Sequence, residues 1–162
     1  MAIRREYRFD EGTITLVEDA PFADIFIRLD AGKSAPPIHL SANAAAGHAK
    51  IYSLTGNPSG SESYDKGLRA LAVDLYLQYL NELGLPPETE ITGTVQGQNI
   101  DEIRNQLGFW KRFGFRIQAR PGLAPRISAP LGSLQLSDGG TRTRGGDSSP
   151  LLPLSALEPC PQ

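Results

Sequence analysis

The segment from Asn99 to Phe115, N-I-D-E-I-R-N-Q-L-G-F-W-K-R-F-G-F, constrains the fold more than any other part of the chain. Asn99 followed three residues later by Glu102 is an asparagine form of the capping box, which predicts the start of a helix. Apolar side chains then recur at helical spacing and would line one buried face: Ile103, Leu107 and Trp110. Gly114 is a natural C-terminal cap. The segment therefore predicts a short amphipathic helix that ends in aromatic residues and leads into a strand.

A longer helix is predicted upstream, over Tyr64–Leu83. Its apolar positions follow the i, i+3, i+4, i+7 pattern of a broad buried face: Leu68, Leu71, Ala72, Leu75, Tyr79, Leu80 and Leu83. Gly84 and the two prolines after it mark the end of this helix. A strand is predicted between the two helices, over Glu90–Val95, and Gly93 inside it indicates a bulge or a close approach of another chain segment.

The other predicted elements are short strands rich in β-branched residues. They are Thr13–Val17, Asp24–Leu29, Ile38–Ser41, Gly47–Leu54 and Phe115–Gln118. Strands followed by helix, strand, helix and strand indicate an α+β fold, a compact mixed sheet with two main helices. Beyond Pro121 only Leu131–Ser137 resembles a strand, and prolines and glycines dominate. We therefore expect one domain over residues 1–120 and an irregular, disordered tail over residues 121–162.

Composition and cysteine content limit the class of protein. The chain is 40% hydrophobic and 21% charged, as in ordinary globular proteins. No segment approaches the roughly 18 consecutive apolar residues of a membrane helix. The charged N-terminus is not followed by an apolar segment, so we expect no secretory signal. Cys160 is the only cysteine, which excludes an internal disulfide and suits a cytoplasmic protein.

Charge is distributed unevenly along the chain. Between residues 101 and 144 the basic residues outnumber the acidic ones: Arg104, Lys111, Arg112, Arg116, Arg120, Arg126, Arg142 and Arg144 against Asp101, Glu102 and Asp138. This half could bind an anionic ligand such as a nucleotide cofactor, could bind nucleic acid, or could simply be a solvated surface. His39 and His48 lack the spacing of a metal pair, so no metal site is expected. Neither a Gly-x-Ser-x-Gly elbow nor a Walker loop is present.

A glycine-led helix, Lys66-Gly-Leu-Arg-Ala70, then a short strand, then a helix ending in aromatic-x-x-x-Gly-Phe resembles the C-terminal half of the GNAT superfamily of N-acetyltransferases. The resemblance covers roughly residues 48–118. It implies an acyltransferase-like domain whose cofactor is acetyl-CoA or another acyl-CoA. The partners it implies are that thioester and an unidentified amine acceptor or a protein partner. The segment Glu18–Ala23 is too short for the helices that form the acceptor rim in the family, so the acceptor side is either reduced or supplied by another subunit, as in a homodimer.

The resemblance also implies where coenzyme A binds. The family places the pyrophosphate against a glycine-containing loop at the start of a helix, where free N–H groups meet the phosphates. Gly67 matches a family glycine, Tyr64 stands where the family has Arg or Gln, and Lys66 and Arg69 would neutralise phosphates. The implied cofactor-binding residues are Leu54, Tyr64, Lys66, Gly67, Leu68, Arg69, Asn99 and Trp110.

The catalytic residues implied by the resemblance are incomplete. Trp110 stands where family members carry a tyrosine that protonates the departing thiolate, and indole supplies no proton at a useful pH. Glu90, at the start of the strand between the helices, is our candidate general base, and His48 is the second candidate. The leading hypothesis is therefore an acyl-CoA-dependent N-acyltransferase-like domain. The alternatives are a non-catalytic interaction module of the same fold and, less favoured, a nucleic-acid-binding α+β domain that uses the arginines from Arg104 onward.

Overall fold

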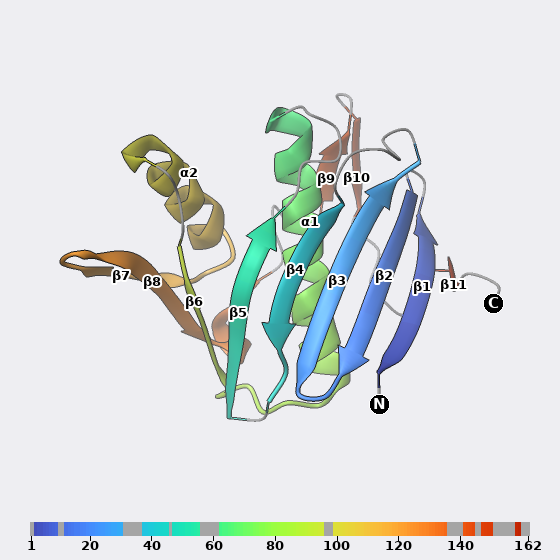
Figure 1. The fold of residues 1–162 in the computed structure, drawn as a ribbon, viewed down its shortest axis with the longest axis horizontal. Coiled ribbons are helices and arrows are strands. Elements are labelled where there is room, and N and C mark those ends of the chain that lie inside the picture. Colours follow the sequence, from blue (N-terminus) through green and yellow to red (C-terminus); the bar gives the residue numbers. More distant parts are fainter. Residues whose placement is uncertain are drawn as a thin grey trace.

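A nine-stranded mixed sheet dominates the computed structural model, in the order β11-β1-β2-β3-β4-β5-β6-β8-β7 (Figure 1). The structure describes residues 2–9, 12–30, 37–45, 47–55, 62–95, 99–135, 141–144, 147–150 and 158–159. The elements are β1 (Ile3–Phe9), β2 (Gly12–Asp19), β3 (Phe22–Leu29), β4 (Ile38–Asn43), β5 (His48–Thr55), α1 (Glu62–Glu82), β6 (Glu90–Thr94), α2 (Ile100–Lys111), β7 (Arg116–Arg120), β8 (Leu123–Pro130), the 3₁₀ turn η1 (Leu131–Ser133), β9 (Thr141–Arg144), β10 (Asp147–Pro150) and β11 (Glu158–Pro159).

Most neighbouring strands of the sheet run antiparallel, as short connections require. The exception is the pair β5–β6, which is parallel and is joined by α1. This pair links an antiparallel block, β1 to β5, to a second block made of β6, β8 and β7. The predicted fold class, an α+β mixed sheet with two main helices, is confirmed.

Alternating side chains divide the sheet into a helix-covered face and an open face. In β2 and β4 every second residue is buried, and the residues between them are half-exposed. Ile25 and Ile27 share the buried face and lie at most 2% exposed. α1 contacts β3 and β4 on that face, and the aromatic end of α2 joins the same core cluster. The open face carries no helix among the residues described.

α1 is buried more completely than a one-sided stripe predicts. The predicted positions Leu68 to Leu80 are buried, but so are Val73, Asp74 and Tyr76, each 1% exposed or less. The sheet covers one side of the helix, and the ribbon of β9 and β10 lies beside it, with β9 in contact (Figure 1). A helix enclosed on several sides needs no wide polar face. Leu83, predicted on the buried face, follows the helix end and is 45% exposed.

α2 begins where the sequence predicted, but it ends at Lys111 with Arg112, not Gly114, as its C-cap. Asn99 is the N-cap, and its Oδ1 accepts a hydrogen bond from the Glu102 N–H at 2.9 Å. Gly114 has φ +103°, a left-handed conformation that favours glycine, and turns the chain into β7. The helix is anchored by Phe109, Trp110, Phe113 and Phe115, whose rings meet mostly edge to face.

The sheet continues past residue 120, where the domain was expected to end and the tail to begin. β8 lies between β6 and β7 and pairs with both. Its two prolines argued against a strand. They are tolerated because Pro125 lies beside a register shift between β7 and β8, and Pro130 is the last residue of the strand. The strand expected over Leu131–Ser137 is also wrong, since Leu131–Ser133 is a 3₁₀ turn.

Two further differences concern the ends of the chain. β1 was not predicted, because its inward positions include Arg5 and Tyr7 rather than a continuous apolar set. β11 pairs with β1, so part of the expected tail contributes an edge strand of the sheet. The rest of the expected disordered tail, residues 136–140, 145–146, 151–157 and 160–162, lies outside the described residues.

Candidate functional site

β5 and β6 are paired at one end and separate at the other. Their parallel register runs only from His48↔Glu90 to Ile51↔Gly93. β5 then continues to Thr55, paired only with β4, and a register shift at Ser41/Ala42 accompanies the separation. Figure 1 shows the two strands meeting at one end and diverging toward their carboxyl ends. The divergence leaves one edge of β5 without a ladder partner in the described part of β6.

Gly93 lies at the last registered pair, where the sequence predicted a close approach. A Cβ at this position would lie 3.3 Å from Ile127 Cδ1 and 3.3 Å from the Ile51 carbonyl oxygen. Glycine therefore lets β8 pack its Ile127 side chain over β6 at the point where β5 departs. The prediction is confirmed as a close approach.

Both helices begin beyond the carboxyl ends of these two strands. α1 follows β5 after residues 56–61, which lie outside the described residues, and α2 follows β6. α1 begins at Glu62, two residues before the predicted start. Its N–H groups without an intrahelical partner therefore include those of residues 62–64. Of the predicted pyrophosphate residues, Tyr64 lies in this first turn, whereas Gly67 and Arg69 lie in the next one.

The predicted cofactor residues occupy different environments. Leu68 is 2% exposed and faces the core, and Leu54 on β5 packs against the same core. Asn99 caps α2, and Trp110 is 6% exposed between the rings of Phe109 and Phe115. Asn99 and Trp110 thus have structural contacts of their own. Tyr64, Lys66 and Gly67 are described only by their place in α1.

A hollow of about 160 Å³ lies at the junction of β5 and β6, with the alternating open-face residues of β5, β6 and β8 among its lining. It is lined by His48, Lys50, Thr92, Gly93, Thr94, Arg120 and Arg126. These residues come from β5, β6, β7 and β8, which are separated in sequence and brought together by the sheet. The lining contains hydroxyl and cationic groups and no carboxylate. Sequence analysis missed Lys50 and did not single out Arg120 and Arg126, because only the strand order brings them together.

The two candidate proton acceptors lie at the paired end of β5 and β6. His48 lines the hollow, and its Nε2 is 3.0 Å from Thr92 Oγ1. Glu90 is opposite His48 in the register and is half-buried, but it does not line the hollow. Ile51, where the strands part, is three residues further along β5, a distance of about 10 Å. The general-base role of Glu90 stays a prediction.

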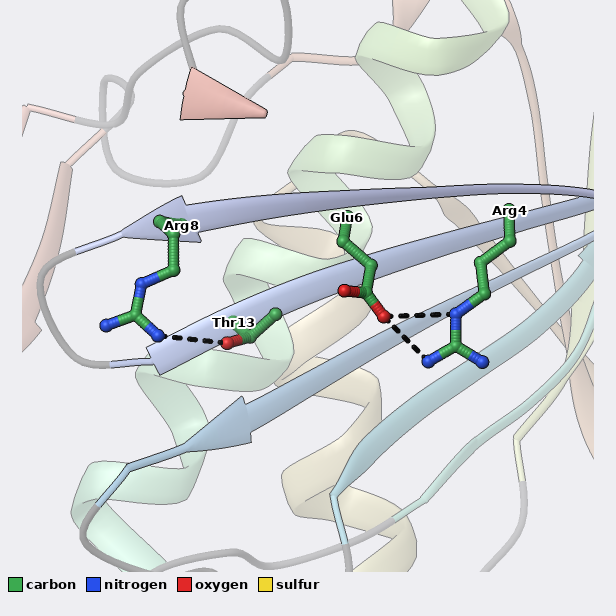
Figure 2. Close-up of polar contacts among 4 residues, drawn as sticks. All are labelled: Arg4, Glu6, Arg8 and Thr13. Atoms are coloured by element: carbon green, nitrogen blue, oxygen red, sulfur yellow. Dashed lines mark hydrogen bonds and ion pairs between the residues drawn. The ribbon is translucent and has the colours of Figure 1, made fainter. Parts of the chain in front are cut away.

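The cations at the other end of the sheet are paired with acids. On the open face Arg4 binds Glu6 at 2.7 Å, and Arg8 Nη2 lies 3.3 Å from Asp30 Oδ2. Figure 2 shows the first of these pairs and the bond from Arg8 to Thr13. His39 Nε2 lies 2.8 Å from Asp24 Oδ1 and stacks on Phe26. The charges of this region are largely satisfied within the protein.

A second polar cluster lies under the sheet. Glu18 accepts from the Tyr79 hydroxyl at 2.7 Å and also binds Arg5. Desolvation by burial raises the pKa of Tyr79, and the hydrogen bond to Glu18 adds to the shift, so the hydroxyl stays protonated and donates. This cluster joins β1, β2 and α1 and does not reach the hollow. Its role is therefore structural.

Two absences hold for the described residues alone. No group of three or more histidine, cysteine, aspartate or glutamate residues there is arranged to hold a metal ion. No helix in those same ranges is long and apolar enough to cross a membrane.

Comparison with known proteins gives a partial likeness to a solved structure. No protein-family model matches the chain, and no curated protein matches it. Among solved structures, the crystal structure of the PaiA N-acetyltransferase from Thermoplasma acidophilum in complex with coenzyme A is similar, with a TM-score of 0.47 and 16% identity. The match covers 67% of this chain and 59% of that chain.

Proposed function

We propose that this chain binds an acyl-coenzyme A, such as acetyl-CoA, and transfers the acyl group to an amine. The observation that carries the proposal is the divergence of β5 from β6 beyond Ile51 and Gly93. Ligands of open sheets bind outside the carboxyl ends of parallel strands, where the strand order changes. The β5–β6 pair is such a point, because it joins the two antiparallel blocks of the sheet.

The proposal assigns the phosphates of the cofactor to the start of α1. A helix N-terminus offers free N–H groups and the positive end of the helix dipole. Lys66 and Arg69 would add positive charge, as the family resemblance implies. The thioester would then lie along the free edge of β5, whose N–H groups can polarise its carbonyl oxygen. Leu54 lies on this part of β5.

The chemical step in this proposal is acyl transfer by proximity. The amine nitrogen attacks the thioester carbon, the C–S bond breaks, and the amine proton passes to a base. Glu90 remains the proposed base, and His48 is the alternative because it lines the hollow from which an amine would approach. No tyrosine stands at position 110, so the thiolate would take its proton from solvent.

A second candidate function is a non-catalytic domain of the same fold that binds a protein partner. The burial of Trp110 favours it, because this residue replaces the usual proton donor and has a packing role instead. This candidate differs from the first in one respect that can be measured: it does not require acyl-CoA binding.

Thermal unfolding of the full chain with and without acetyl-CoA separates the two candidates. A ligand at about 100 times its dissociation constant adds roughly 2.7 kcal/mol, enough to raise the Tm by several degrees. We expect Lys66→Glu to weaken this shift and Lys111→Glu, in the last turn of α2, to leave it unchanged. Absence of any shift at millimolar acetyl-CoA would exclude the enzyme hypothesis and leave the interaction module.

A further inference from the structure

We infer that the hollow on the open face binds the oxyanion, a carboxylate or a phosphate, of a small amine acceptor. The inference rests on the proposed function, since it assigns the second substrate of the same site. The hollow reaches Gly93 and Thr94, the last residues of β6 before β5 departs. An acceptor anchored there would have its amine near the divergence, where the thioester is proposed to lie.

The charge of the hollow indicates the chemistry of the ligand. Lys50, Arg120 and Arg126 come from three strands and line one small volume. In the described residues no ion pair joins any of the three to a carboxylate. The ammonium group of Lys50 lies 5.5 Å from the ring of Tyr52, a contact that leaves its donors available. Cations brought together without a counter-charge repel one another, and a bound anion removes that cost.

Arg120 is held in place before any ligand binds. Its Nε and Nη2 donate to the carbonyl oxygen of Ala124 at 3.0 and 2.8 Å across the β7–β8 turn. These bonds satisfy the guanidinium on one side and reduce its side-chain entropy. The remaining donors, fixed in the planar fork of arginine, suit a carboxylate or phosphate.

Glu90 is the carboxylate on the open face that could offset the positive charge of the hollow. It lies on the open face next to His48, at the paired end of β5 and β6. It is not part of the hollow lining and has no recorded ion pair within the described ranges. Lys50 is opposite Thr92 and Arg126 is opposite Thr94, so these charges lie one and two open-face positions from Glu90 along β6, and in the described residues neither forms an ion pair with it.

The size and the surroundings of the hollow favour a small ligand over nucleic acid. Its volume of about 160 Å³ equals that of roughly five liquid waters. A nucleic acid strand needs a basic track that follows many phosphates. On the open face beyond β5, that track would cross Asp24, Asp30 and Glu6, which pair with the basic residues there.

Calorimetric titration of the full chain tests the inference with matched probes. Inorganic phosphate and O-phosphoethanolamine represent the phosphate source, and succinate and β-alanine represent the carboxylate source. Ethanolamine is the amine without an anion. We expect O-phosphoethanolamine or β-alanine to bind and ethanolamine not to bind. The stronger of the two identifies the source of the oxyanion.

Two variants and one control test whether the anion binds in the hollow. Arg126→Gln and Lys50→Gln should each weaken anion binding by about tenfold, the typical effect of losing one charge-assisted bond. Arg4→Gln, on the same sheet face but paired with Glu6, should leave binding unchanged. Acetyl-CoA binding should also be unchanged in Arg126→Gln, because the donor phosphates are assigned to the start of α1.

Several outcomes would overturn the inference. One is failure of every anionic probe to bind at millimolar concentration. Another is loss of acetyl-CoA binding in Arg126→Gln, which would assign the hollow to the donor's phosphates. Tight, salt-dependent binding of single-stranded RNA that Arg126→Gln abolishes would assign it to nucleic acid. If the anionic probes bind but acetyl-CoA does not, the proposed function fails and the acceptor assignment falls with it.

Discussion

Basic side chains lie at both ends of the open sheet face, but only at one end do they have carboxylate partners. At the β1–β4 end, Arg4, Arg8 and His39 each meet a carboxylate. At the β5–β8 end, Lys50, Arg120 and Arg126 surround a hollow that has no carboxylate in its lining. Exposed ion pairs contribute little to stability. The difference therefore concerns charge more than stability: one region has paired its basic side chains with acids, and the other has not.

The largest loss of stability is expected from a change in the hydrophobic core that the two regions share. Phe113 is fully buried with Phe109 and Trp110, and these rings belong to one core cluster with the aliphatic residues under β1–β4. Phe113→Ala should cost about 3–5 kcal/mol. Urea unfolding followed by circular dichroism and by Trp110 fluorescence should give one coincident transition in both proteins. Two separate transitions would mean that the regions are independent units.

The next prediction compares the stability loss at a glutamate of the buried cluster with the loss at a glutamate of the open face. Glu18→Ala removes the acceptor of the buried Tyr79 hydroxyl and the partner of Arg5, so it should cost about 1–3 kcal/mol. Glu6→Ala breaks only the exposed pair with Arg4 and should cost less than about 1 kcal/mol. Urea midpoints of the two variants measure the difference. Equal losses would contradict the distinction between the buried cluster and the open face.

A smaller effect is expected at the start of α2. Asn99→Ala removes the bond to the Glu102 N–H and should lower the free energy of unfolding by about 1 kcal/mol. Because the side chain already has this role, acetyl-CoA affinity should change little. Asn99→Asp keeps an acceptor and serves as the control. A large loss of acetyl-CoA binding in both variants would indicate that Asn99 contacts the cofactor, contrary to this prediction.

The smallest effect should be the stability change of Arg126→Gln. Removing one of three neighbouring cations should change the free energy of unfolding by no more than about 0.5 kcal/mol, and in the stabilising direction at low salt. Urea unfolding at two ionic strengths measures it. A clear destabilisation would show that Arg126 has a structural partner, as the cations near β1 do, and the comparison between the two regions would fail.

The helices and most strands could be predicted because their signals are local. The cap at Asn99, the turn at Gly114 and the stop at Gly84 depend on neighbouring residues alone, and each is present in the structure. β8 was missed because its prolines are unfavourable in isolation and acceptable only beside a register shift and at a strand end. β1 was missed because its inward positions include Arg5, whose ion pair with Glu18 on β2 forms only in the folded sheet.

The candidate site was predicted less well than the fold. Gly93 was singled out correctly, since a glycine within a strand indicates a close approach wherever the strand lies. Trp110 is a core residue, as its place on the predicted buried face of the helix indicated, and its cofactor role stays a prediction. Lys50, Arg120 and Arg126 gave no local signal, since nothing in their neighbouring residues predicts that they converge.

The sequence by itself determined the class of the sheet, the two helices and their ends, because periodicity, caps and turns act over a few residues. Only the tertiary structure decided where β5 and β6 part and which basic side chains meet there. Strand order and register bring together residues that are separated by more than 40 positions, and they are set by packing of the whole sheet against α1 and α2. The charge that a ligand would meet is therefore a property of the folded sheet.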